Sequence, residues 1–195
     1  SGIDPTPEQW KVIAELQAKQ GFLPLFDFAY QGFGDGLQED SAGIRALLGA
    51  DELIIASSFS KNFGLYNQRT GALTVVAKNA TEADLAQGHM ARAVRANYSN
   101  PPAYGGALVT TVLEDAVLRA QWEEEVAAMR KHILAMRVAL VEGLRAAGVQ
   151  KDFSFLAKQK GMFSFSSLTD PQVEALKNEF GIYAVKGDRK STRLN

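Results

Sequence analysis

Hydrophobic residues recur at helical spacing over several stretches of the chain. The first stretch has the pattern of a helix start and stop, because Thr6 suits an N-cap, Pro7 and Gln9 suit the first turn, and Gly21 suits the end. The same spacing returns farther along the chain. It predicts helices over residues 7–20, 40–49, 81–97, from about 107, over about 115–147, and after 170.

Short apolar runs without helical spacing lie between these stretches and predict strands. They cover residues 22–28, 53–57, 72–77, 161–165 and 182–185. The first three runs are typical of strands buried on both faces, although Pro24 favours a strand start or an edge. Strands that alternate with helices over short connections indicate an α/β fold with a largely parallel sheet. Ligands bind at the carboxyl ends of such strands, which directs attention to Asp27, Tyr30 and the loop 57–71.

The helix expected over about 115–147 is long for a compact domain and suggests a link between two domains. We predict that residues 1–125 belong to a large domain and that 126–187, with the linking helix, form a partial small α+β domain. Residues 188–195 carry four charges and no apolar pattern, and they match the translation of a common sequencing adapter. We interpret them as a non-native tail rather than a natural polar tail, and we expect the chain to be a piece of a longer protein.

Composition and charge narrow the classes of partner. The chain has 21 Lys and Arg against 22 Asp and Glu, a net charge of -1, so there is no electrostatic case for nucleic acid or an anionic membrane. Zero cysteines and two histidines exclude a disulfide scaffold, a cysteine nucleophile and a metal site built from thiolates or several histidines. Every apolar run is far shorter than a membrane span. We expect a cytoplasmic protein with a small-molecule partner and no metal.

The loop after the 53–57 strand carries the most informative chemistry. Lys61 follows the hydroxyl groups of Ser58 and Ser60, and Arg69 comes eight residues later. Hydroxyl groups and a guanidinium are suitable donors for a phosphate dianion. An amine beside a phosphate site fits pyridoxal 5'-phosphate, which a lysine binds covalently. Taken alone the pattern is weak, since a loop lysine is usually only solvated.

Several segments around this lysine resemble one family. The stretch Ser58-Phe-Ser-Lys-Asn-Phe-Gly-Leu-Tyr-Asn-Gln-Arg69 resembles the cofactor attachment motif of class I aminotransferases, and it is most similar to aspartate and aromatic amino acid aminotransferases. Segments 27–33, 95–102 and 161–165 agree in order and spacing, and the similarity covers residues 1 to about 187. Thr70 departs from the aliphatic residue usual in the family. The resemblance implies pyridoxal-phosphate transferase fold type I, with a three-layer α/β/α large domain that is incomplete at its N-terminal side.

The resemblance also implies roles for the residues that would hold the cofactor. Lys61 would bind it covalently and then move the proton between the substrate and the cofactor. Asp27 would pair with the pyridine nitrogen, and Tyr30 would donate to the phenolic oxygen. Without the resemblance, Asp27 would be interpreted as a strand-end cap and Tyr30 as an ordinary half-buried aromatic residue. The residues around the phosphate would be Ser58, Ser60 and Arg69.

Two further residues would contact the substrate. The resemblance implies that Arg95 reaches the active site of a neighbouring subunit and grips the distal carboxylate of aspartate or glutamate; otherwise it is a solvated arginine on a helix. Phe163 would pack near the substrate, although core packing alone could explain an aromatic residue there. The family arginine that holds the α-carboxylate would fall near Arg189, inside the tail, and we leave that role unassigned.

The expected function is therefore that of a homodimeric aminotransferase. It would move an amino group between aspartate, or an aromatic amino acid, and 2-oxoglutarate by a ping-pong mechanism, while this piece alone would be inactive. The sequence does not decide between aspartate and aromatic substrates, because dual-specific enzymes keep the same arginine. Two alternatives stay open: another fold-type-I pyridoxal enzyme such as a decarboxylase or lyase, and a catalytically dead binding domain.

Overall fold

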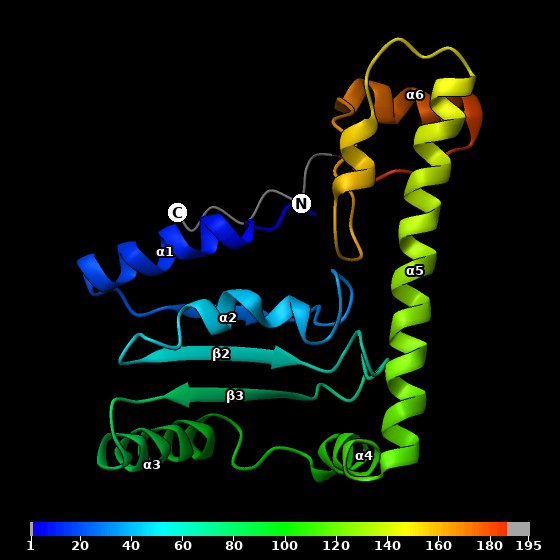
Figure 1. Ribbon diagram of the computed structural model, residues 1–195. Helices are drawn as coiled ribbons and strands as arrows, with labels where there is room; N and C mark the ends of the chain where they lie inside the picture. Colours follow the sequence, from blue (N-terminus) through cyan, green and yellow to red (C-terminus); the bar gives the residue numbers. More distant parts are fainter. Residues whose placement is uncertain (1, 187–195) are drawn as a thin grey trace. The chain divides into compact units, whose positions relative to one another are not determined.

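A computed structural model describes residues 2–186, which belong to two compact units (Figure 1). Residues 5–131 form the first unit. Residues 2–4, together with the described residues from 132 onwards, form the second. The long helix α5 (Ala116–Ala146) contributes residues to both units. The predicted tail 188–195 lies outside the described residues.

The first unit contains a mixed sheet in the order β1 (Leu25–Phe28), β2 (Leu53–Ser58), β3 (Gly71–Val76). Strands β1 and β2 are parallel, as predicted, whereas β2 and β3 are antiparallel and run in opposite directions in Figure 1. The prediction of a largely parallel sheet is therefore wrong for β3. The reason is the connection over 59–70, which contains turns but no helix, and a parallel neighbour normally requires a helical crossover.

Helix α1 (Pro7–Gln20) has the predicted bounds. The Thr6 hydroxyl accepts from the Gln9 N–H at 3.3 Å, the Gln9 side chain accepts from the Thr6 N–H at 2.8 Å, and the helix ends at Gly21. The Trp10 ring lies 6.0 Å from that of Phe26, so α1 packs against β1. The helix predicted over 40–49 is shorter: it consists of the 3-10 turn η1 (Glu39–Ser41) and α2 (Ala42–Ala46).

Two more helices complete this unit before α5 begins. Helix α3 (Ala80–Asn97) lies beside β3 in Figure 1 and begins after Asn79, whose side-chain oxygen accepts from the Glu82 N–H at 3.0 Å. Helix α4 (Ala103–Glu114) follows the prolines at 101 and 102. A side chain at Gly105 would collide with the hydroxyl of Thr70, so α4 packs closely on the end of the β2–β3 connection.

The second unit contains the end of α5, the 3-10 turn η2 (Ser154–Lys158) and the predicted helix α6 (Asp170–Phe180). The strands predicted over 161–165 and 182–185 are absent from the described residues, and both predictions are wrong here. In the first segment, the backbone oxygens of Gly161 and Phe163 accept hydrogen bonds from the buried Arg137 and not from a neighbouring strand. The second segment is open to solvent, with Tyr183 81% and Val185 83% exposed.

The sheet has one open face, which corrects the prediction of strands buried on both faces. Leu25 pairs with Ile54, and Leu73 pairs with Ala56, so the two leucines lie on the same face. Leu25 is 68% exposed and Leu73 is 56% exposed. Among the strand residues, only Leu53 is fully buried. The described part of the chain therefore leaves apolar sheet surface uncovered. No helix within residues 2–186 combines the length and apolar character needed to cross a membrane.

Candidate active site

Lys61 and Tyr30 meet at the carboxyl ends of the two parallel strands. Tyr30 lies just after β1 and Lys61 just after β2. The Lys61 Nζ atom lies over the Tyr30 ring, 4.6 Å from its centroid, in a cation–π arrangement. Both side chains are half-buried. The parallel pairing of β1 and β2 thus brings together two residues that the sequence singled out separately.

The side-chain oxygens of Asp27, Ser58 and Ser60 lie near the same end of the strands as Lys61 and Tyr30. Ser58 ends β2, and its hydroxyl accepts from the Ser60 N–H at 3.2 Å. Asp27 is opposite Ala56 in the register, so Asp27 and Ser58 lie on the same, open face of the sheet. Asp27 is exposed, whereas Ser60 is buried. A carboxylate, two hydroxyl groups and an amine therefore lie near one end of the strand pair.

Arg69 lies on the return arm of the same loop. Its backbone has φ 49°, the left-handed region that residues other than glycine seldom adopt. Its guanidinium Nη1 donates to the backbone oxygen of Tyr66 at 3.4 Å, and the residue is exposed. Strain of this kind concentrates at functional sites. The predicted phosphate-binding residues thus lie at the end of β2 and in the loop that follows it.

The loop after Tyr30 is held by Asp40, which the sequence reasoning missed. The two Asp40 carboxylate oxygens accept four backbone N–H groups at 2.7 to 3.3 Å. The donors are Gly32, Gly34, Asp35 and Gly36. A side chain at Gly34 would collide with this carboxylate. Three alternating glycines before an acidic residue were the available signal, since such a loop exposes several N–H groups to one acceptor.

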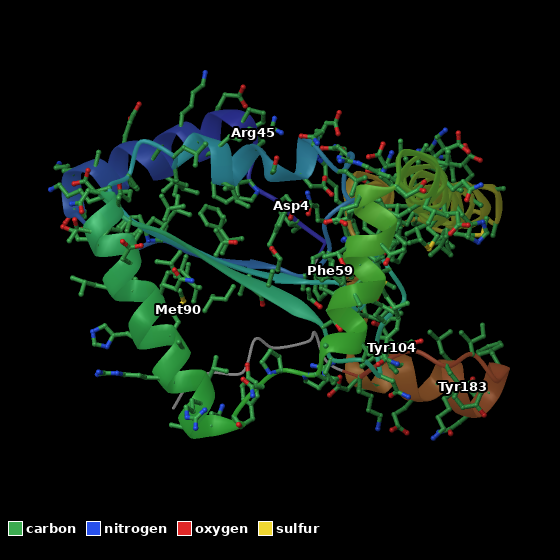
Figure 2. The ribbon with its side chains drawn as sticks, turned by 90° about the horizontal axis from the view of Figure 1, so that it is seen from below. Asp4, Arg45, Phe59, Met90, Tyr104 and Tyr183 are labelled. Carbon is green, nitrogen blue, oxygen red and sulfur yellow. The ribbon has the colours of Figure 1, made fainter. Side chains whose placement is uncertain are left out.

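Trp122 of α5 packs against the aromatic residues of the loop that carries Lys61. Phe63 stacks on Trp122 with the ring centroids 4.5 Å apart, and Phe59 meets Phe63 edge-on at 5.5 Å. Figure 2 shows Phe59 near the carboxyl end of β2. The Trp122 indole also donates to the backbone oxygen of Asn62 at 2.7 Å. The backbone next to Lys61 is therefore fixed by packing and by a hydrogen bond.

The two residues predicted to contact the substrate lie in different units. Arg95 is exposed in the last turn of α3, where a cation interacts favourably with the helix dipole. Phe163 belongs to the second unit and is 45% exposed. Its loop is organised by Arg137 of α5, which is only 7% exposed. Arg189 lies outside the described residues.

The Arg137 guanidinium donates four hydrogen bonds to the segment that carries Phe163. The acceptors are the Ser164 hydroxyl at 2.7 Å and the backbone oxygens of Gln159 at 2.8 Å, Gly161 at 2.5 Å and Phe163 at 2.9 Å. Burial lowers the pKa of Arg137, because desolvation penalises the charged form. These bonds explain why residues 161–165 do not form the predicted strand.

Removing this guanidinium should destabilise the second unit. In Arg137→Met the four acceptors lose their donor, and we expect the free energy of unfolding to fall by about 2–4 kcal/mol. Arg137→Lys should recover only part of that loss, because an ammonium lacks the planar fork. Urea unfolding of the full-length enzyme measures the change in stability. Arg145→Met, which alters an exposed arginine on the same helix, is the control. Equal midpoints for Arg137→Met and Arg145→Met would contradict this role.

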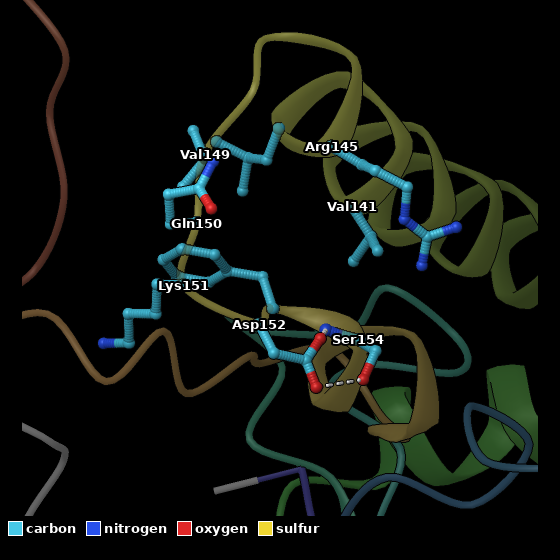
Figure 3. A pocket seen from close by; sticks show the side chains of 9 residues that line it. Val141, Arg145, Val149, Gln150, Lys151, Asp152 and Ser154 are labelled. Atoms are coloured by element: carbon cyan, nitrogen blue, oxygen red, sulfur yellow. Dashed lines mark hydrogen bonds between the residues drawn. The ribbon is translucent and has the colours of Figure 1, made fainter.

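A pocket of about 220 Å³ lies where α5 ends, and Figure 3 shows the side chains that line it. The Asp152 carboxylate accepts from the Ser154 N–H at 2.8 Å and from its hydroxyl at 2.9 Å, and these bonds lower the Asp152 pKa. None of the predicted site residues lines the pocket. Residues 2–186 also contain no group of three or more acidic, histidine or cysteine residues able to hold a metal ion.

Comparison with known proteins decides the family. The family model described as aminotransferase class I and II matches residues 1–193. The chain belongs to the class I and II aminotransferase family. The match extends into the 188–195 segment, whose interpretation as a non-native tail stays a prediction.

The aminotransferase relatives are similar over nearly the whole chain. An aspartate aminotransferase of Salmonella typhi is 56% identical over 190 residues, which are 97% of this chain and 48% of the relative. An aromatic-amino-acid aminotransferase of Paracoccus denitrificans is 46% identical over the same shares. The chain thus spans about half the length of the curated relatives it matches.

Solved structures of aminotransferases share the fold. An aromatic-amino-acid aminotransferase from Burkholderia pseudomallei, covalently bound to pyridoxal phosphate, matches with a TM-score of 0.93 and 46% identity over 95% of this chain and 47% of its own. A mitochondrial aspartate aminotransferase from Trypanosoma brucei matches with a TM-score of 0.92 and 38% identity over 95% and 49%. These findings confirm the resemblance and the predicted fold type I, present here as a partial chain. The roles of the individual residues stay predictions.

Proposed function

We propose that this chain is part of a pyridoxal-phosphate-dependent transaminase that moves an amino group between aspartate, or an aromatic amino acid, and 2-oxoglutarate. The main support is the approach of the Lys61 amine to the Tyr30 ring, 4.6 Å apart, at the carboxyl ends of parallel strands. The names of the relatives, aspartate and aromatic-amino-acid aminotransferases, support the substrate classes. The Burkholderia structure, covalently bound to pyridoxal phosphate, supports the cofactor.

The side chains at this edge suit the cofactor. The half-buried Lys61 amine can be reached by an aldehyde and form a covalent bond with it. Ser58, Ser60 and Arg69 offer the neutral and charged donors that a phosphate needs. Asp27 presents a carboxylate on the open face of the sheet, where a pyridine ring could lie. When bound, the cofactor supplies an electron sink for the negative charge that develops at the substrate Cα atom.

The candidate residues would then have distinct tasks in the reaction. Lys61 Nζ would hold the cofactor covalently in the resting enzyme and, once released, would move the proton between the substrate Cα atom and the cofactor. The Tyr30 hydroxyl would donate a hydrogen bond to the phenolic oxygen of the cofactor and so help to orient it. The Asp27 carboxylate would pair with the pyridine nitrogen and so favour its protonated form. Phe163 would pack near the substrate, as the resemblance implies.

The working enzyme that we propose is a cytoplasmic homodimer with shared active sites. Residues 1–125 would belong to its large domain and 126–187 to its small domain. Arg95, exposed near the end of α3, is available to a neighbouring subunit and would bind the distal carboxylate of the substrate there.

Arg95 gives a direct test of substrate class. Arg95→Gln in the full-length enzyme removes a charge-assisted bond, so we expect kcat/KM for aspartate and glutamate to fall by about 10- to 100-fold. The loss for aromatic amino acids should be much smaller, because they lack the distal carboxylate. Arg92→Gln, an exposed arginine on the same helix, is the matched control. Equal losses for both substrate classes would show that Arg95 is a structural residue.

A further inference from the structure

A hydrogen bond joins the loop that carries Lys61 to the loop that carries Tyr30. The Asn62 side-chain Nδ2 donates to the backbone oxygen of Gln31 at 3.3 Å, across 31 positions of the sequence. Asn62 and Gln31 are the next residues after Lys61 and Tyr30, the pair whose side chains meet at 4.6 Å. We propose that Asn62 is a positioning residue that fixes the Lys61 amine against Tyr30, a role that rests on the proposed function of this site.

The Asn62 end of this bond is held from behind by α5. Asn62 is 4% exposed, and its backbone oxygen accepts from the Trp122 indole at 2.7 Å. The next residue, Phe63, stacks on the same indole. The Asn62 backbone therefore has little freedom to follow a loop that moves.

The Gln31 end is held with equal firmness. The Gln31 side chain donates to the backbone oxygen of Leu37 at 2.8 Å. Its neighbour Gly32 accepts from Arg130 of α5 at 2.8 Å and donates to the Asp40 carboxylate at 2.8 Å. Two braced loops thus meet at the Asn62 amide, and the bond between them links the backbone beside Tyr30 to the residue next to Lys61.

The Oδ1 atom of the Asn62 side chain indicates that the main role of Asn62 is not to stabilise the fold. The Asn62 Oδ1 atom is buried and has no hydrogen-bond partner among the described residues. A buried acceptor without a donor is unfavourable, and a bond of 3.3 Å lies just beyond the usual range. For stability alone, a leucine of similar shape would serve at least as well. What a leucine cannot do is donate to Gln31.

The test compares Asn62→Leu with Asn67→Leu, a change of an exposed asparagine in the same loop, in the full-length enzyme. We expect Asn62→Leu to unfold at nearly the urea concentration of Asn67→Leu. Its kcat should fall by about 10- to 100-fold, with KM for the amino acid changed by about twofold or less, since small misplacements of catalytic groups cost rate. Visible circular dichroism per bound cofactor, which reports cofactor orientation, should decrease. Asn62→Gln, which keeps the amide donor, should restore part of both signals.

The outcomes separate this role from the proposed function. If the unchanged enzyme carries cofactor on Lys61 but Asn62→Leu keeps its kcat and its dichroism, the positioning role is overturned and the function stands. A large loss of stability in Asn62→Leu, or failure to fold, would also overturn it, since Asn62 would then be a structural residue. Absence of cofactor on Lys61 in the unchanged enzyme would overturn the proposed function itself.

Discussion

Replacing Lys61 with alanine in the full-length enzyme should abolish transamination and the visible band of the bound cofactor. The amine would serve as both the covalent anchor and the proton carrier, so we expect kcat to fall by about 10⁴-fold or more. The fold should survive, because the half-buried side chain contributes a cation–π contact with Tyr30 worth only about 0.5–1 kcal/mol.

Two controls separate chemistry from charge in this experiment. Lys61→Arg keeps the positive charge but not the nucleophilic amine, so it should be as inactive as Lys61→Ala. Lys78→Ala removes an exposed lysine that pairs with Asp51 at 3.4 Å, and it should keep normal turnover. If Lys61→Ala and Lys78→Ala turned over at similar rates, the chemistry would have to be assigned to another residue.

Expressed alone, the 195-residue chain should be prone to aggregation, bind pyridoxal phosphate weakly and have no transaminase activity. Leu25 and Leu73 leave one face of the sheet open, and the chain spans about half the length of its relatives. Each uncovered Å² of apolar surface forfeits about 25 cal/mol, against a domain stability of only about 5–15 kcal/mol. The exposed apolar surface of the sheet therefore lowers the free energy of unfolding by a large share of the stability of such a domain.

The purified chain can be tested for aggregation by size-exclusion chromatography, for cofactor binding by titration and for cooperative folding by thermal unfolding. A double change, Leu25→Ser with Leu73→Ser, should reduce aggregation without producing activity, because it alters only the open face. A soluble chain that unfolds cooperatively, binds one cofactor and shows turnover would mean that the open face and the short length have been misjudged.

Local signals in the sequence were sufficient for α1. Thr6, Gln9 and Gly21 determine the bounds of α1 through bonds within a few residues, so the cap pattern predicts them directly. The approach of Tyr30 and Lys61 could also be expected, because each follows a strand and parallel neighbours end at the same edge. The expectation of a largely parallel sheet did not hold for β3, because the direction of a strand depends on the connection before it. The 59–70 loop gave no pattern that excluded a helical crossover.

The supporting residues were harder to predict because their partners are distant in sequence or belong to the backbone. Arg137 lies between Ile133 and Val141 on one side of α5, and a cation among apolar positions was the signal that could have found it. The Asn62 bond spans 31 positions and joins an amide to a backbone oxygen. No residue pattern specifies such a partner, since every residue offers a backbone oxygen.

The account depends most directly on the covalent attachment of the cofactor to Lys61. The measurement is borohydride reduction of the full-length enzyme loaded with pyridoxal phosphate, followed by digestion and mass mapping of the labelled peptide. We predict one pyridoxyl group per chain, on Lys61, and loss of the label when aspartate without an oxo acid is added before reduction. A pyridoxyl group on another lysine, or none at all, would contradict the account.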